Sequence, residues 1–415
     1  MRTIRYIVTC GVLTGHAVVR NTPVGILANY LMRGRMQTFI RPLHVPRIMV
    51  KYTCILLFVS SFSAQAQAQE ATIRIDRIIG DDDTEIYFDR INEIIPDGDG
   101  NLYVTDDRRR DIQHITSAGE LIRTIGSRGE GPGQFREISS VTLNGDSLVV
   151  HDAHSMRVTV FTRDGRLLNT YSLSDDVITI ESLISVLPES HFLMYRAPNS
   201  NHEMAEAFRI VDSNGRIRQM LNISAADLYD VDDDISDYVV SSQYNLQIQS
   251  IGDQKYLLTS RLYNGQVIQL NINPKSGKSN TNIINQADVS MSDVYKRVFM
   301  KRGDALPPLT NVISRQNGRF AYKLKRMSLG FIRASDQRMA VLYREGMHPS
   351  ERKLFIDTWE ENERKIEKYE VRVIGDGIDR TGVRIMYSDD DGILYMRSST
   401  LDGVPVLAIG KLELP

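Results

Sequence analysis

The sequence contains very few cysteines. Only Cys10 and Cys54 occur among its 415 residues, and both lie within the first 69 positions. The rest of the chain therefore has no thiol for a disulfide, a covalent nucleophile or a cysteine-ligated metal. It also lacks a Gly-x-Ser-x-Gly elbow, a P-loop and a zinc-binding His-Glu-x-x-His motif. These absences exclude a disulfide scaffold and several common enzyme classes.

Acidic residues are missing from the first 69 positions, which contain seven arginines and Lys51. Arg47 and Lys51 precede a short apolar run at 54–59, and the alternating sequence Ala-Gln-Ala-Gln-Ala follows at 64–68. Since this order is typical of a secretory signal peptide, 49–68 is predicted to be one. We interpret 1–48 as a mis-assigned start or an unstructured extension. A buried apolar helix or a retained anchor is the alternative for 54–59.

Export to the periplasm or the extracellular space follows from this interpretation. The apolar run is too short to cross a bilayer as a permanent helix, so we expect no stable membrane span in the mature chain. The residues after position 69 include 42 basic and 52 acidic side chains, a net charge of −10. Because such a surface repels phosphates, nucleic acid is not an expected partner.

Short alternating runs of β-branched and aromatic residues fill the chain after residue 70, and Gly, Asn and Asp separate them. Three motifs recur in neighbouring segments: Asn101-Leu-Tyr-Val-Thr-Asp106 as Ser147-Leu-Val-Val-His-Asp152, 112–115 as 158–161, and 119–121 as 165–167. Each pair is offset by 46 residues, the length of a four-stranded propeller blade. We therefore predict an all-β protein with a single β-propeller over 70–415.

Weaker copies continue to the C-terminus, where 391–396 repeats the pattern of 99–104. If the segment near 286–325 is an insertion, the spacing of about 50 residues predicts six blades. Seven blades follow if that segment contains a degenerate one. We expect 73–76 to close the ring by pairing with 406–412, since closure leaves no exposed sheet edge. Helices are predicted only at 289–301 and 347–352.

A glycine-rich segment, Gly126-Ser-Arg-Gly-Glu-Gly-Pro-Gly-Gln-Phe135, stands between the first two blades. Together with the Leu-Tyr-Val-Thr-Asp pattern, it resembles the NHL-repeat family of six-bladed propellers over 94–170. The resemblance implies that this glycine–proline turn leads from the outer strand of one blade to the inner strand of the next. The sequence is also similar to exported six-bladed propellers of Bacteroidetes-like bacteria that have no established activity.

A basic or titratable residue occurs at or just after the end of the second strand of each predicted blade. These residues are Arg108 and Arg110, His151 and His154, Arg196, Arg261, Arg344 and Arg397. In a propeller, the loops after the second strands gather around one mouth of the central channel. A basic rim there suits a carboxylate or a phosphate, which guanidinium groups bind through paired hydrogen bonds. Local pairing with Asp106, Glu345 or Asp402 is the alternative.

Clusters of acidic residues at 81–83, 97–99, 232–234 and 389–391 raise the question of calcium. The spacing of an EF-hand is absent, so roles in hairpin turns and at the surface are favoured, and no cofactor is expected. His151 and His154 flank Asp152 in a set that resembles a metal site. However, Asp152 is the repeat equivalent of Asp106, and we expect it to make turn hydrogen bonds.

The favoured interpretation is a binding module rather than an enzyme. Its ligand would be an anionic small molecule, a peptide or a glycan at the channel mouth, or its partner a cell-envelope protein. The alternative is a metal-dependent hydrolase or lyase, similar to propeller lactonases or amidating lyases, with calcium or zinc in the channel. Glu93, Asn144 and Asn311 are the candidate ligands for that metal. A sensor is disfavoured because no membrane helix or signalling domain accompanies the propeller.

Overall fold

A computed structural model provides the structure, which describes thirteen segments. They are 70–81, 86–174, 182–195, 208–221, 246–252, 254–273, 278–286, 295–300, 310–315, 318–334, 338–346, 351–360 and 366–415. All of them belong to one compact unit, Ala68–Pro415. None of these segments contains a helix that is long and apolar enough to cross a membrane.

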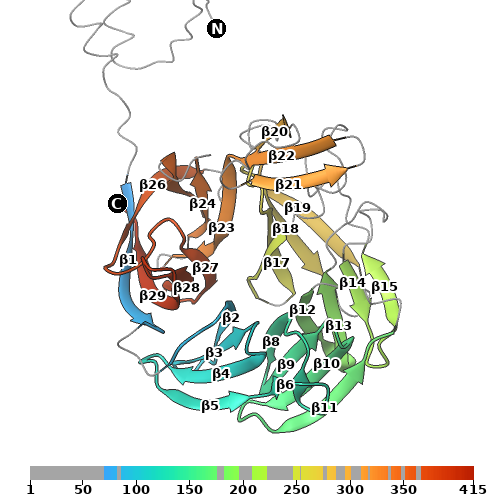
Figure 1. Ribbon diagram of the computed structural model, residues 1–415. Coiled ribbons are helices and arrows are strands. Elements are labelled where there is room, and N and C mark those ends of the chain that lie inside the picture. Colours follow the sequence, from blue (N-terminus) through green and yellow to red (C-terminus); the bar gives the residue numbers. More distant parts are fainter. Residues whose placement is uncertain are drawn as a thin grey trace, which may run out of the picture. The chain divides into compact units, whose positions relative to one another are not determined.

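Four-stranded antiparallel sheets form the first four blades (Figure 1). Blade one contains β2 (Ile91–Pro96), β3 (Asn101–Asp106), β4 (Asp111–Thr116) and β5 (Leu121–Ile125). Blade two contains β8 (Ser140–Asn144), β9 (Ser147–Asp152), β10 (Arg157–Thr162) and β11 (Leu167–Ser172). Blade three contains β12 (Ser182–Leu187), β13 (His191–Tyr195), β14 (Phe208–Val211) and β15 (Ile217–Leu221). Blade four contains β16 (Leu246–Ser250), β17 (Lys255–Ser260), β18 (Val267–Ile272) and β19 (Ser279–Asn285).

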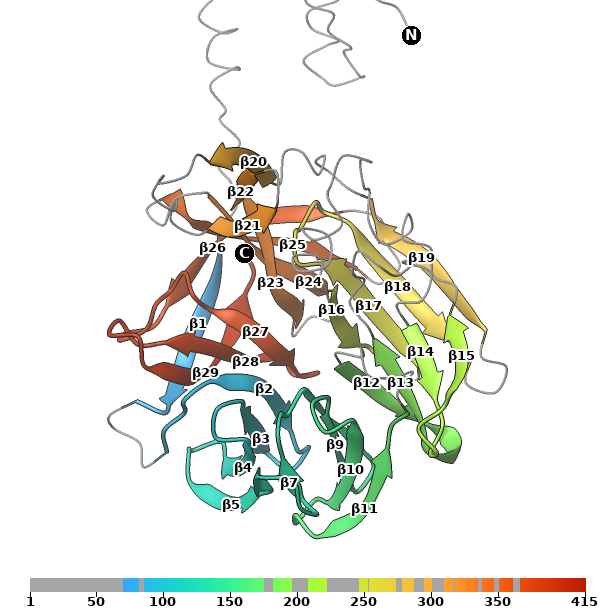
Figure 2. The ribbon, with the colours of Figure 1, turned by 45° about the vertical axis from the view of Figure 1, so that its right-hand side comes forward.

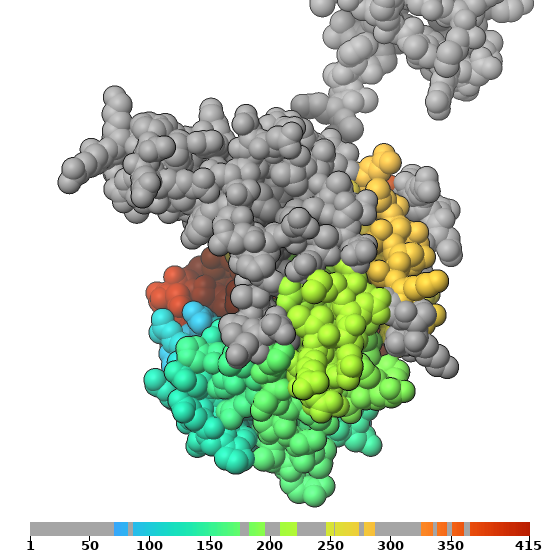
Figure 3. All heavy atoms as spheres, turned by 90° about the vertical axis from the view of Figure 1, so that its right-hand side faces the viewer, coloured from blue at the N-terminus to red at the C-terminus, as the bar shows by residue number. Residues whose placement is uncertain are grey.

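Blades five and six share one eight-stranded sheet. Blade five contains β23 (Arg326–Arg333), β24 (Met339–Glu345), β25 (Lys353–Trp359) and β26 (Glu367–Ile374). Blade six contains β27 (Arg384–Ser388), β28 (Ile393–Ser399), β29 (Pro405–Glu413) and β1 (Glu70–Ile79). The inner strands β2, β8, β12, β16, β23 and β27 surround the centre of the unit (Figures 1 and 2). The fourth strands lie at its outside, where β15 and β19 are seen at the surface in Figure 3.

The N-terminal strand closes the ring. β1 pairs antiparallel with β29, with Ile73 opposite Leu412, and parallel with β26, with Glu70 opposite Glu370. Ile73 and Ala71 are completely buried, so the closing strand also contributes to the core. The predicted pairing of 73–76 with 406–412 and the predicted six blades are both confirmed.

The segment between blades four and five forms a sheet of its own. It contains β20 (Tyr295–Met300), β21 (Thr310–Arg315) and β22 (Gly318–Leu324), in the order β20-β22-β21 (Figures 1 and 2). These three strands add no seventh blade. The predicted helix at 289–301 is wrong over 295–300, because pairing with β22 makes this stretch a strand. Residues 289–294, 301 and 347–350 of the two predicted helices lie outside the described segments.

Two aspartates at equivalent positions of the repeat stabilise the connecting segments that lead from one blade to the inner strand of the next. Oδ2 of Asp106 accepts the backbone N–H groups of Asp89 (2.7 Å) and Arg90 (3.1 Å), which precede β2. Its Oδ1 accepts those of Arg108 (2.9 Å) and Arg109 (3.0 Å) in the turn after β3. In the second blade, Asp152 likewise accepts N–H groups from both the crossing and the turn: Arg136, Glu137 and Ser155. The predicted turn role of Asp152 is confirmed.

The Asn-Gly turn of blade three gives the first testable prediction. Gly215 has a φ of +73°, and an added Cβ would overlap the carbonyl oxygen of Ser172 in blade two. Gly215→Ala should lower the free energy of unfolding by about 1–3 kcal/mol, measured by urea denaturation. Gly98→Ala is the matched control, because φ is +87° there and no atom lies within 4 Å of the added Cβ. Equal losses in both variants would show that the contact between blades is unimportant.

Candidate functional site

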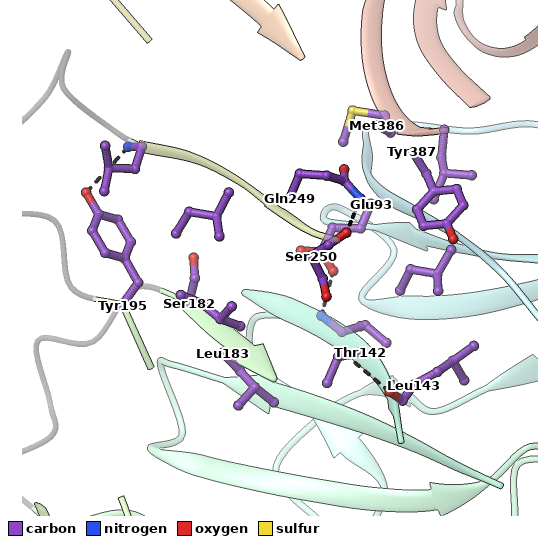
Figure 4. Close-up of a pocket in the computed structure, with 16 residues that line it drawn as sticks. Glu93, Thr142, Leu143, Ser182, Leu183, Tyr195, Gln249, Ser250, Met386 and Tyr387 are labelled. Atoms are coloured by element: carbon purple, nitrogen blue, oxygen red, sulfur yellow. Dashed lines mark hydrogen bonds between the residues drawn. The ribbon is translucent and has the colours of Figure 1, made fainter. Parts of the chain in front are cut away.

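A cavity of about 400 Å³ lies between the inner strands (Figure 4). Residues from β2, β8, β12, β16 and β27, together with Tyr195 of β13, line it. Its polar members are Glu93, Thr142, Ser182, Tyr195, Gln249, Ser250 and Tyr387. Aliphatic side chains and Met386 form the remainder of the wall. Glu93 is the only carboxyl group among these lining residues, and none of them is Lys, Arg or His.

The strand register places the predicted rim at one end of the channel. The last residue of β3, Asp106, pairs with Ile91 at the start of β2, and Ser260 pairs with Leu246 in blade four. Arg397 likewise pairs with Arg384, the first residue of β27. Since each inner strand starts where the second strand ends, the turns after the second strands and the starts of the inner strands share one mouth.

Four arginines gather at this mouth and form what we call the arginine cluster: Arg261, Arg344, Arg384 and Arg397. The pKa of Arg384 is lowered from its usual value to about 9, chiefly by burial and in addition by the positive charges of the other three arginines. The pKa of Arg397 is lowered by burial and then by Arg261, and that of Arg344 by burial and then by Arg352. The guanidinium groups from blades four, five and six are therefore close enough to repel one another electrostatically.

Little in the described structure neutralises the arginine cluster. Nη1 of Arg397 donates to the carbonyl oxygen of Ile91 (2.7 Å), and Nη2 of Arg344 lies 3.5 Å from Sδ of Met327. Among the described residues, the side chain of Arg384 makes no hydrogen bond or ion pair, and Nε of Arg261 is buried without a partner. Neighbouring Arg352 has two such nitrogens, Nε and Nη2. Asp379 and Asp107 supply negative charge near Arg344 and Arg397, but neither forms an ion pair with the cluster.

The predicted rim residues have different positions. Arg261, Arg344 and Arg397 come together, whereas Arg196 lies outside the described residues. Arg108 and His154 are exposed, and Arg110 takes a left-handed conformation with a φ of +61°. His151 is buried, and burial lowers its pKa to about 4, so its ring is neutral at pH 7 and adds no positive charge to this mouth.

Sequence reasoning missed Arg384. The rim was predicted from residues at or just after the end of each second strand. Arg384 is instead the first residue of an inner strand, so this criterion did not include it. Its register partner Arg397 was among the predicted residues. A search for arginines at both ends of each inner hairpin would have found Arg384. Arg352 was missed as well, because it lies in the segment after β24 and not at the strand end.

The candidate metal ligands are not brought together. Glu93 lines the cavity, but Asn144 pairs with Ser147 at the far end of β8, and Asn311 belongs to β21 in the separate sheet. Within the described segments, no three His, Cys, Asp or Glu residues form a group that could hold a metal. The metal site therefore stays a prediction without structural support.

Two of the four acidic clusters are seen to shape hairpin turns. Asp97 accepts the backbone N–H groups of Asp99 and Asn101, and Asp389 accepts those of Asp391 and Ile393. The turn role predicted for 97–99 and 389–391 is confirmed. Of the other two clusters, 82–83 and 232–234 lie outside the described residues.

Comparison with known proteins agrees with this fold. A family model described as "6-bladed beta-propeller" matches residues 83–266. A member of the DUF4221 family from Bacteroides vulgatus has a similar structure, with a TM-score of 0.52 and 10% identity over 84% of this chain and 100% of its own. A virginiamycin B lyase from Staphylococcus aureus reaches a TM-score of 0.41 and 12% identity over 82% of this chain and 99% of its own. A search of curated proteins gave no match. The predicted resemblance to six-bladed propellers is confirmed, and at these identities the similarities concern the fold alone.

Proposed function

We propose that this six-bladed β-propeller is an exported binding module that recognises an anionic ligand at the arginine cluster. The observation that carries the proposal is the gathering of four guanidinium groups whose pKa values are lowered by burial. None of the four makes an ion pair within the described structure. The signal-peptide pattern at 49–68 supports export, and the ligand would be a small molecule, a peptide terminus or a glycan that bears a carboxylate or a phosphate.

The positive charge of the arginine cluster is incompletely neutralised by the residues around it. Holding like charges together away from water is costly, and an anion placed between them would relieve the repulsion. The guanidinium groups of Arg384 and of Arg261, whose Nε has no partner, could form the paired hydrogen bonds that guanidinium makes with a carboxylate. Because the chain after residue 69 has a net charge of −10, this local positive field would also direct an anion to one mouth of the channel.

The metal-dependent hydrolase or lyase receives no comparable support. Its candidate ligands Glu93, Asn144 and Asn311 belong to the cavity wall, a distant turn and a separate sheet. Binding is therefore the function that the described geometry favours.

Arg384→Gln tests this proposal. Titration calorimetry with citrate and with inorganic phosphate should show an affinity about 10- to 100-fold lower than that of the unaltered protein, since a hydrogen bond to a charged group contributes about 1.5–3 kcal/mol. Arg372→Gln is the matched control, because Arg372 is an exposed residue of β26 that pairs with Glu70. Unchanged affinity in Arg384→Gln, or an equal loss in the control, would contradict the proposal.

A further inference from the structure

Glu93 lies on the inner strand of blade one, with its side chain at the cavity (Figure 4). The backbone N–H of Val141, on β8 of the next blade, donates to Oε2 of Glu93 (2.5 Å). Part of the side chain keeps surface open to the cavity, while protein atoms surround the remainder. The carboxyl is thus fixed by one hydrogen bond and has an oxygen left for a ligand.

The surroundings of Glu93 favour its protonated form. The pKa of this carboxyl is raised to about 8: burial raises it most, the hydrogen bond from Val141 partly offsets this, and the negative charge of Asp107 adds to the increase. The other titratable groups of the cavity wall are Tyr195 and Tyr387, and burial raises the pKa of Tyr387. At neutral pH the Glu93 carboxyl therefore carries an O–H group that can donate a hydrogen bond.

One member of the arginine cluster, Arg397, contacts β2 close to Glu93. Nη1 of Arg397 donates to the carbonyl oxygen of Ile91, two residues before Glu93. Two residues of a strand span roughly 7 Å. Asp107 acts on the pKa of both Arg397 and Glu93, which agrees with this proximity. A ligand held by the cluster could therefore extend past Ile91 and reach Glu93.

We propose that the central cavity is a second subsite, which takes the hydroxyl-bearing body of a sugar acid while the carboxylate of the same molecule binds the arginine cluster. This inference rests on the anion-binding function proposed above. Glu93 donates a hydrogen bond to an oxygen of the ligand body. Thr142, Ser182, Gln249 and Ser250 offer further donors and acceptors.

The size and character of the cavity agree with such a ligand. Its volume of about 400 Å³ lies within the range of roughly 300–1,000 Å³ that is usual for small-molecule sites. The wall combines hydroxyl and amide groups with aliphatic side chains, which suits a sugar ring with polar edges and less polar faces. A ligand that consisted of a carboxylate alone would leave the hydroxyl and amide groups of the cavity wall without a hydrogen-bond partner.

D-glucuronate and acetate are the probes that test the second subsite. Both bear one carboxylate, but only glucuronate has a hydroxyl-bearing body. Calorimetry at pH 6.5 should give an affinity for glucuronate at least roughly tenfold higher than for acetate, because several hydrogen bonds are added. Equal affinities, both weakened by Arg384→Gln, would overturn the second subsite and leave the anion-binding function in place. If glucuronate, acetate, citrate and phosphate all fail to bind, both proposals are overturned.

The proton on Glu93 gives an independent readout. As pH rises from 6.5 to 8, the unaltered protein should lose roughly twofold in affinity for glucuronate, because about half of the Glu93 carboxyl groups have then lost the donor proton and gained a negative charge. Glu93→Gln should bind glucuronate with an affinity that stays nearly constant, since an amide donates at every pH. Glu120→Gln, at an exposed turn, removes the same charge elsewhere and should keep the pH dependence. A constant affinity in the unaltered protein, or the same decline in Glu93→Gln, would overturn the role of Glu93.

Discussion

Asp357→Ala is expected to lower the free energy of unfolding by about 3–5 kcal/mol, the usual cost of removing one partner from a buried charge pair. Asp357 lies on β25 and is only 3% exposed. Its two oxygens accept hydrogen bonds from Tyr263 (2.8 Å) and Tyr343 (3.1 Å), and Nη2 of Arg326 lies 3.5 Å from Oδ2. Urea denaturation measures the loss.

The size of this effect follows from the burial of Arg326. Its guanidinium lies over the ring of Tyr343, with 4.3 Å between the guanidinium carbon and the ring centroid, and its Nε is 3.3 Å from Oε1 of Glu345. Without Asp357, the cation keeps the partly exposed Glu345 but loses its most deeply buried carboxylate. A buried charge with incomplete pairing costs far more than one neutral hydrogen bond.

Tyr263→Phe provides the scale against which Asp357→Ala is judged. Tyr263 follows β17 in blade four, so its hydrogen bond to Asp357 joins blades four and five. Loss of this hydroxyl should cost about 1–2 kcal/mol, because the carboxylate keeps its other partners. If Asp357→Ala were no more destabilising than Tyr263→Phe, the ion pair with Arg326 would contribute nothing to stability.

The features predicted correctly from the sequence are those with a local or periodic signal. Three such features arise within a single blade, because each blade must form its strands and turns from its own residues. They are the 46-residue offset, the Asn-Gly and Asp-Gly turns, and the repeated Asp106 and Asp152. Closure by 73–76 was predictable as well, because an open ring would leave unpaired strand edges.

The contacts between blades could not be predicted in the same way. Arg326, Tyr263 and Asp357 are far apart in the sequence, and their network depends on how blade five packs against blade four. Likewise, the arginines of the cluster belong to different blades and become neighbours only when the blades close into a ring. Arg384 belongs to the inner strand β27, which the sequence prediction did not consider. The strand at 295–300 was missed because its pairing partner, β22, lies beyond β21 and so leaves no local signal in the sequence.

Asp106→Ala should also lower the free energy of unfolding substantially, by about 3–4 kcal/mol in urea denaturation. The carboxylate accepts four backbone N–H groups, two before β2 and two in the turn after β3. Asp106 itself is completely buried, so the substitution leaves an unfilled space beside donors that have lost their acceptor. Charge-assisted bonds of this kind contribute more than neutral ones, and an unmet buried donor costs about 1–3 kcal/mol.

Asp106→Ala should also affect the proposed binding site. Asp106 fixes Arg90, which directly precedes Ile91, and Ile91 provides the carbonyl oxygen that holds Arg397. Loss of this anchor should therefore weaken citrate binding as well as stability. Asp146→Ala is the control, since its side chain is fully exposed in the Asn-Gly-Asp turn of blade two. Asp106→Asn, which keeps an acceptor oxygen, should recover part of both losses. Normal citrate binding in a destabilised Asp106→Ala protein would show that the crossing into blade one supports the fold without positioning Arg397.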